Sequence, residues 1–175
     1  MEGKNYLNIF FINVRMQTGF SSVKQAEIEI MAKRFGMDVI HMQEVHITEE
    51  TFSQCTFTQN NYNIVFNNNR TKNGTASLVK TDLDISNVAM DNNGRVIIFD
   101  ICEHTQVNLY LPAGSDAENK NRREEYFSLT LPQLLQNRRN CGIVGGDFNC
   151  IVDAIDSSNN PDLKISKGLK RLSWG

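Results

Sequence analysis

Residues 7–14 read Leu-Asn-Ile-Phe-Phe-Ile-Asn-Val, a run of β-branched and aromatic side chains that predicts a buried strand. Ser21 or Ser22 can cap a helix that follows, and Gly36 ends it. Apolar residues recur at helical spacing between these limits, namely Ile28, Met31, Ala32 and Phe35. Residues 37–42 are again apolar and indicate a second buried strand. The start of the chain therefore predicts a β-α-β unit.

The middle of the chain consists of short β-rich runs. Asn73-Gly74 and Asn93-Gly94 are strong hairpin signals between such runs. We therefore predict one antiparallel meander, whose strands are residues 62–67, 75–80, 84–90, 95–101 and 106–111. A last apolar strand is expected at residues 141–146, directly before Asp147.

Helical patterns flank these strands. A short helix is expected to begin at Thr48, and helical periodicity returns over residues 117–139, where Pro132 is expected to kink or split the helix. Residues 163–174 also have helical spacing; their basic residues, Lys164, Lys167, Lys170 and Arg171, are expected on a solvated face. The order of the elements predicts a mixed α/β sandwich, with sheets inside and helices outside.

Length and composition fit a single domain over residues 1–175. The sequence is 40% hydrophobic, with no apolar run long enough to cross a bilayer, so we expect no membrane partner. The first residues lack the features of a secretory signal, and an intracellular location, nucleus or cytoplasm, is expected. The net charge of −2 gives no overall basic footprint, so any contact with phosphates must be local. The oligomeric state is left open.

The four cysteines form no C-x-x-C pair, and we expect reduced thiols that are mostly packed rather than a zinc cage or a disulfide framework. They are Cys55, Cys102, Cys141 and Cys150. His41 and His46 are five residues apart around a strand and are expected on opposite faces, which argues against a zinc pair.

Five polar residues lie at or just past predicted strand ends, where side chains leave the core and can converge: Asn13, Glu44, Tyr110, Asp147 and Asn149. Mg²⁺ prefers oxygen ligands and is often held by one or two carboxylates, so Glu44 backed by Asn13 is chemically sufficient. Asp147 would then orient or deprotonate an attacking water. Each residue also has a common structural use: Glu44 as a solvated strand end, Asp147 with Asn149 as an Asx turn, and Tyr110 as packing.

The order of these residues resembles the motifs of a known superfamily. The matching segments are Asn8-Ile-Phe-Phe-Ile-Asn13, Asp38-Val-Ile-His-Met-Gln43-Glu44, Gly74-Thr-Ala-Ser-Leu-Val79, Asn108-Leu-Tyr110-Leu-Pro112 and Gly146-Asp147-Phe-Asn149. They are similar to the endonuclease/exonuclease/phosphatase superfamily, which includes DNase I-like enzymes. The resemblance is greatest to the apurinic-endonuclease-like domain of LINE-type non-LTR retrotransposons.

This resemblance implies a four-layer α/β sandwich, two mixed sheets flanked by helices, that hydrolyses phosphodiester bonds of DNA with Mg²⁺ or Mn²⁺ and no small-molecule cofactor. It makes Glu44 the metal ligand with Asn13 as its helper. It makes Tyr110 a phosphate-contacting residue, Asp147 the catalytic carboxylate and Asn149 its phosphate-binding companion. The resemblance thus predicts a DNA-nicking endonuclease domain of a retrotransposon-derived protein.

Two departures from the superfamily pattern change this expectation. Ala113 stands where many relatives have asparagine after the Tyr-x-Pro run, and no Ser-Asp-His motif follows Asp147. Losing the stabilising histidine of that motif costs about 10²–10³-fold in rate. We therefore expect a domain that lacks its C-terminal strands and has impaired activity. The alternatives are an inactive remnant of the same fold with residual metal or nucleic-acid binding, and a superfamily phosphatase or RNA nuclease.

Overall fold

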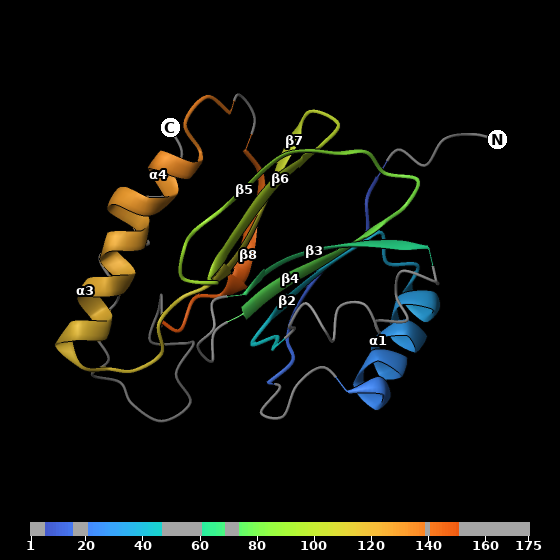
Figure 1. The fold of residues 1–175 in the computed structure, drawn as a ribbon, viewed down its shortest axis with the longest axis horizontal. Coiled ribbons are helices and arrows are strands. Elements are labelled where there is room, and N and C mark those ends of the chain that lie inside the picture. The colour runs from blue at the N-terminus through green and yellow to red at the C-terminus, as the bar shows by residue number, and fades with distance from the viewer. Residues whose placement is uncertain (1–5, 16–20, 47–60, 69–73, 139–140, 151–175) are drawn as a thin grey trace. The chain divides into compact units, whose positions relative to one another are not determined.

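The computed structural model describes residues 6–15, 21–46, 61–68, 74–138 and 141–150 (Figure 1). The chain divides into two compact units, one built from residues up to Tyr110 together with Arg138–Asp147, the other from Leu111–Asn137 together with the residues from Phe148 onward. The prediction of one domain over residues 1–175 stays a prediction. The expected helix at Thr48, Cys55 and the expected helix at residues 163–174 lie outside the described residues.

The first unit contains a four-stranded sheet in the order β1-β2-β4-β3. Its strands are β1 (Ile9–Asn13), β2 (Val39–Gln43), β3 (Tyr62–Asn68) and β4 (Gly74–Lys80). β1 and β2 are parallel and are joined through helix α1 (Ser22–Phe35), which confirms the predicted β-α-β unit. β4 pairs antiparallel with β3, as the Asn73-Gly74 signal predicted, and also with β2.

Helix α1 begins and ends where the sequence predicts. The Ser21 side chain accepts a hydrogen bond from Lys24 N, and Gly36 closes the helix in the left-handed conformation, with φ of 57°. Ile28 and Ala32 are buried against the sheet, but Phe35, which shares their helical spacing, is 52% exposed. Phe35 lies in the last turn, where its ring packs on Phe10 at the surface.

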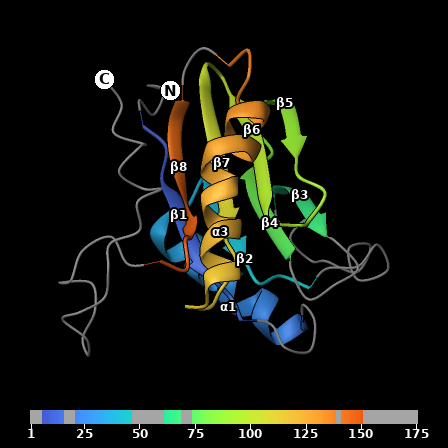
Figure 2. The ribbon, with the colours of Figure 1, turned by 90° about the vertical axis from the view of Figure 1, so that its left-hand side faces the viewer.

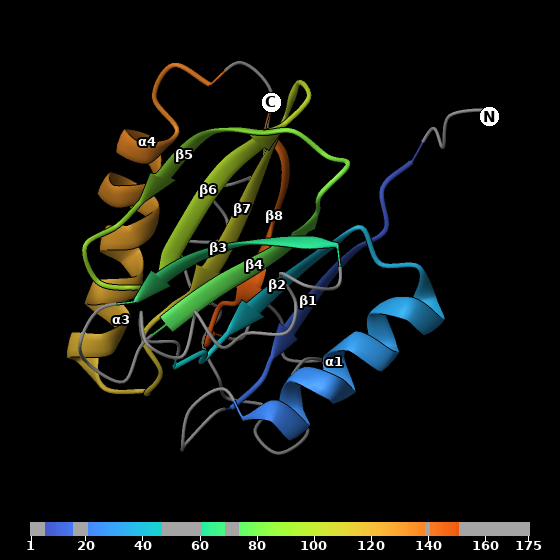
Figure 3. The ribbon, with the colours of Figure 1, turned by 45° about the vertical axis from the view of Figure 1, so that its right-hand side comes forward.

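The second sheet of this unit has the order β5-β6-β7-β8. Its strands are β5 (Ile85–Met90), β6 (Val96–Ile101), β7 (His104–Tyr110) and β8 (Cys141–Asp147). The first three are antiparallel, and β8 lies parallel to β7. Figure 3 shows the two sheets together with α1. One apolar core lies between α1 and the first sheet and a second core joins the two sheets, which explains why every residue of β2 is buried.

All five strands of the predicted meander are present, but they do not form one sheet. The chain leaves the first sheet after β4 and enters the second at β5. Alternating sequence patterns identify strands but not their partners, and the apolar faces of Val79 and Ile97 meet across the sandwich instead of side by side. The predicted fold class, an α/β sandwich with two mixed sheets, is confirmed.

In the second unit, α3 (Ala117–Glu125), a π-helical segment (Tyr126–Thr130) and α4 (Leu131–Leu134) follow one another without a break (Figure 2). Pro132 lies in the first turn of α4, where its missing N–H needs no acceptor. The expected kink or split is not found at Pro132, because a π-helical segment interrupts the α-helix before it, and the helix ends at Leu134 and not at residue 139. No helix in the described parts of the chain has the length and apolar character needed to span a membrane.

Two of the cysteines can be placed. Cys102 is an exposed free thiol in the turn between β6 and β7, with φ of 53°, and Cys150 is half-buried and forms no disulfide within the described residues. The exposure of Cys102 departs from the expectation of mostly packed thiols, because this cysteine lies in a turn and not in a strand.

Candidate functional site

The two parallel strand pairs of the first unit end at the same place. Asn13 is the register partner of Gln43 at the end of β1 and β2, and Tyr110 is the partner of Asp147 at the end of β7 and β8. Asn13 Nδ2 donates hydrogen bonds to Glu44 Oε1 at 2.9 Å and to Asp147 Oδ2 at 2.7 Å. The structure thus brings together two predicted carboxylates, one from each sheet.

The Asn13 amide is fixed at both ends. Its Oδ1 accepts a hydrogen bond from Arg15 N at 3.0 Å, so the amide nitrogen faces the carboxylates. Val14 N donates to Gln43 O at 3.0 Å and keeps the end of β1 on β2. A neutral donor between two like charges reduces their mutual repulsion without cancelling the negative potential that a cation would require.

Glu44 has a strained backbone. It is a half-buried, non-glycine residue with φ of 57°, in the left-handed region that costs L-residues about 1 kcal/mol. The next residue holds this turn in place, because Val45 N donates to Gly74 O at 3.0 Å. This conformation directs the Glu44 carboxylate to Asn13 instead of continuing the alternation of β2. Such strain at a polar strand end is typical of functional sites.

The two glycines before Asp147 permit the close packing that places it. A Cβ at Gly145 would collide with the Phe11 ring, and a Cβ at Gly146 would collide with the Leu109 carbonyl oxygen. Gly146 also has φ of 135°, which L side chains rarely adopt. Asp147 therefore depends on both glycines for its position.

Tyr110 and Arg95 form the cationic side of the site. Arg95 Nη1 donates to Tyr110 O at 3.0 Å, and the guanidinium carbon lies 5.0 Å from the centre of the Tyr110 ring. Burial raises the pKa of the Tyr110 phenol, and so does the nearby negative charge of Glu44, while Arg95 opposes the rise. The Tyr110 hydroxyl therefore stays protonated and can donate a hydrogen bond.

Arg95 was missed by the sequence analysis, although it directly follows the Asn93-Gly94 turn signal. Asp91 shapes this turn: its Oδ1 accepts from Arg95 N and from Val96 N, each at 2.8 Å. Asn67, on the first sheet, donates to the same Oδ1 at 2.9 Å. Within the described part of the chain, the Arg95 side chain donates one hydrogen bond, the one to Tyr110 O, so its remaining donors can serve an anionic ligand.

Asn149, the remaining predicted site residue, belongs to the second unit. Its Nδ2 donates to Leu111 O at 2.8 Å, and its backbone is left-handed, with φ of 46°. In the same unit, Phe148 stacks on Phe127 with a ring separation of 6.3 Å. The expected phosphate contact of Asn149 stays a prediction.

No histidine joins this group. His41 is fully buried, stacks on Phe11 at 4.7 Å and lies 2.8 Å from Ser77 Oγ through Nδ1. Burial lowers its pKa to about 3, and the Gln106 side chain opposes this effect. Nowhere in the described ranges do three or more His, Cys, Asp or Glu side chains gather. The two carboxylates, Glu44 and Asp147, offer oxygen ligands, which suit a hard cation such as Mg²⁺ better than zinc.

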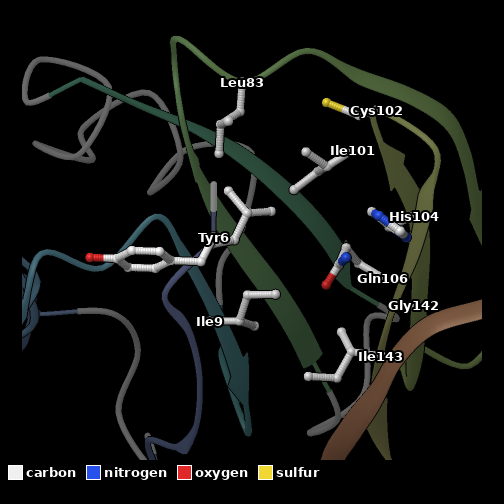
Figure 4. Close-up of a pocket in the computed structure, with 10 residues that line it drawn as sticks. Tyr6, Ile9, Leu83, Ile101, Cys102, His104, Gln106, Gly142 and Ile143 are labelled. Atoms are coloured by element: carbon white, nitrogen blue, oxygen red, sulfur yellow. The ribbon is translucent and has the colours of Figure 1, made fainter. Parts of the chain in front are cut away.

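A separate pocket of about 580 Å³ lies at the opposite ends of the strands (Figure 4). Ile9 at the start of β1, His104 at the start of β7 and Ile143 near the start of β8 line it. None of the predicted site residues lines this pocket. Its lining is mainly apolar, so it offers no comparable set of charged groups.

No protein-family profile matches the chain, and no curated protein matches its sequence. Solved structures do share the fold. An AP endonuclease from Archaeoglobus fulgidus superposes with a TM-score of 0.74 and 21% identity, over 95% of this chain and 68% of that one. The 3′-5′ exonuclease NExo from Neisseria meningitidis has a TM-score of 0.72 and 18% identity, over 90% and 64%.

A further structure from Neisseria, described as 3′ phosphatase NExo bound to a product DNA hairpin, has a TM-score of 0.69 and 15% identity. It matches over 86% of this chain and 61% of its own. This chain thus spans about two thirds of the length of these similar structures. At these sequence identities the structural similarity establishes the fold alone.

Proposed function

We propose that this chain is a nuclease domain that hydrolyses phosphodiester bonds of DNA with the help of Mg²⁺ or Mn²⁺. The observation that carries the proposal is the bridge that Asn13 makes between Glu44 and Asp147, which gathers two carboxylates at the ends of two sheets. The names of the similar structures, an AP endonuclease and a 3′-5′ exonuclease, support DNA as the substrate.

The residues present fit a divalent cation. The Glu44 carboxylate would hold it, with Asn13 keeping Glu44 and Asp147 in place. When bound, the metal would neutralise charge on the phosphate and polarise its oxygen atoms. Asp147 would orient a water molecule and accept its proton. The Tyr110 hydroxyl and the Arg95 guanidinium would donate hydrogen bonds to phosphate oxygens.

The finer part of the proposal is a DNA-nicking endonuclease of a retrotransposon-derived protein, acting inside the cell, in the nucleus or the cytoplasm. The order of the five motif segments in the sequence supports it. We also propose that residues 1–175 by themselves have impaired activity, since residues 148–175 contain no histidine and the buried His41 is a poor substitute. Translating the gene beyond the codon for Gly175 would separate this reading from an inactive remnant. A frame that continues into a Ser-Asp-His motif would favour the enzyme.

The direct test is the nicking of supercoiled plasmid DNA with Mg²⁺ and with Mn²⁺, by this chain and by one extended through any continuing frame. Open-circular product that requires the metal and disappears with a chelator is the expected result. No metal-dependent product from either chain would overturn the proposal.

A phosphatase is the second candidate, because a structure described as a 3′ phosphatase with a product DNA hairpin shares this fold. The same carboxylates would serve either reaction. A hairpin oligonucleotide with a 3′-phosphate distinguishes them: release of inorganic phosphate without nicking of the plasmid would favour the phosphatase.

A further inference from the structure

Two buried amides connect the sheets just below the candidate site. Gln43 on β2 is 1% exposed and Asn108 on β7 is fully buried. Gln43 Nε2 donates to Asn108 Oδ1 at 2.7 Å, which makes a direct hydrogen bond between the two sheets. Apolar side chains form a core between the sheets, but buried polar side chains such as His41 and Ser77 lie on β2 and β4, so the bonds of the pair must show what it does.

Asn108 also binds the backbone of the opposite sheet. Its Nδ2 donates to Met42 O at 3.2 Å and to Ala76 O at 3.0 Å, on β2 and β4. One side chain thus joins three strands from two sheets. Burying an amide is favourable only when such bonds replace those to water, and an apolar pair of similar size would fill this space without that requirement. Hydrogen bonds differ from apolar packing in fixing both distance and direction.

The position of the pair in the sequence indicates what it fixes. Gln43 directly precedes Glu44, whose left-handed backbone is strained and must be held by its surroundings. Asn108 lies two residues before Tyr110, on the same face of β7, and Tyr110 is the register partner of Asp147. The pair therefore links the strand end that carries Glu44 to the strand ends that carry Tyr110 and Asp147.

We propose that Gln43 and Asn108 are positioning residues that set the separation of Glu44 from Tyr110 and Asp147. Neither residue is expected to contact substrate. That the pair fixes this separation follows from the hydrogen bonds alone, whereas the effect of the pair on turnover rests on the proposed function. Because a misplacement of about 1 Å can cost 10²-fold in rate, a loosened pair would lower kcat without removing any reacting group.

The test compares three variants. Asn108→Leu removes all bonds of the pair, and Gln43→Leu is the milder change because Asn108 keeps its bonds to the backbone. Tyr62→Phe is the matched control, since it removes another buried hydrogen bond, the 2.7 Å bond from Tyr62 Oη to Met37 O near the start of β2. All three variants lose a buried hydrogen bond, but only the first two lose one beside the site.

The readout that does not depend on activity is the hydrogen exchange of the Asn13 side-chain amide, followed by NMR. We expect its protection to fall at least tenfold in Gln43→Leu and Asn108→Leu and to stay unchanged in Tyr62→Phe. Unchanged protection in folded Gln43→Leu would overturn the inference, as would an equal loss in Tyr62→Phe.

Turnover gives the second readout. We expect kcat for plasmid nicking to fall about 10–100-fold in Gln43→Leu and in Asn108→Leu, with KM within about twofold. The double variant is expected to lose no more than the worse single variant, because the two residues act as one unit. Fully additive losses would contradict a shared role. If neither the parent chain nor the extended chain cuts DNA, the proposed function fails, while the exchange measurement still decides the inference.

Discussion

Asn13 Nδ2 lies 2.7 Å from Asp147 Oδ2, although the two residues are 134 positions apart and belong to different sheets. Asn13 ends β1 and Asp147 ends β8, so this hydrogen bond closes the sandwich at the end where the polar side chains meet. A second bond from the same nitrogen includes Glu44. The amide is therefore the centre of the candidate site.

Replacing Asn13 with alanine removes the donor that both carboxylates share. We expect the affinity for Mn²⁺ to fall about 10–100-fold, as is usual when a group that orients metal ligands is lost. Isothermal titration calorimetry with Mn²⁺ measures this. Asn119→Ala is the control, because its side chain also donates to a carboxylate, that of Asp116, in the second unit. Equal affinity in Asn13→Ala and the parent chain would show that Asn13 does not organise the site.

Glu44→Gln and Asp147→Asn each replace a carboxylate with a neutral group of the same shape. We expect either change to abolish plasmid nicking, because the metal loses its ligand in one and the water loses its base in the other. Glu103→Gln changes an exposed carboxylate in the turn between β6 and β7 and should cut normally. Full activity in either site variant would break the site assignment.

Arg95→Gln removes the cation beside Tyr110 and leaves a polar side chain. We expect the Kd for a short DNA duplex to rise about tenfold, since a charge-assisted hydrogen bond to phosphate contributes about 1.5–3 kcal/mol. Fluorescence anisotropy of labelled DNA measures the change. The control is Arg122→Gln, which removes an exposed arginine that pairs with Glu118 on α3. If Arg95→Gln and Arg122→Gln bind the duplex equally weakly, the lower net charge of the protein and not the site explains the loss of affinity.

Gly146→Ala should destabilise the fold by more than the strain of a positive φ alone explains. Gly36 and Gly146 both have positive φ, but a Cβ at Gly36 has its nearest neighbour at 3.7 Å whereas one at Gly146 collides with the Leu109 carbonyl. We expect Gly36→Ala to lower the free energy of unfolding by about 1 kcal/mol and Gly146→Ala by about 3 kcal/mol or more. Urea denaturation distinguishes the two, and equal losses would contradict the crowding at Gly146.

The stability of the fold should depend on His41 in acid. Its pKa is about 3 in the folded chain and 6.5 without burial, so the unfolded chain binds one more proton between these values. The contribution of His41 to the free energy of unfolding is complete above about pH 6.5. Below that pH it falls by about 1.4 kcal/mol per pH unit, until about pH 3. In His41→Gln, urea denaturation between pH 4 and 7 should show a correspondingly smaller slope. Identical slopes would mean that His41 is not buried in its neutral form.

The sequence predicted the strands and α1 well, because apolar spacing and end signals such as Ser21 and Gly36 are local. It did not predict which strands share a sheet. The Asn93-Gly94 signal identified the turn that pairs β5 with β6, but no local feature shows that the connection after β4 carries the chain to the other sheet. The exposure of Phe35 was missed for a related reason, since helical spacing does not show where the covered sheet ends.

For the site, strand-end polar residues and motif order pointed to Asn13, Glu44, Tyr110 and Asp147, and the structure places these four at adjacent strand ends. The left-handed turn at Glu44 and the stacking of Arg95 on Tyr110 were not predictable, because both depend on contacts between distant segments. Their chemical roles, like that of Asn149, remain for the variants above to test.

The parallel pairing of β8 with β7 also has a consequence for biosynthesis. Parallel neighbours need a long connection, and here residues 111–140 must be made before β8 can add to its sheet. A nascent chain therefore carries Asn13 and Glu44 long before it carries Asp147, and contacts over such sequence separation form late. Any activity that needs both carboxylates would therefore have to wait until β8 has been made and has joined its sheet.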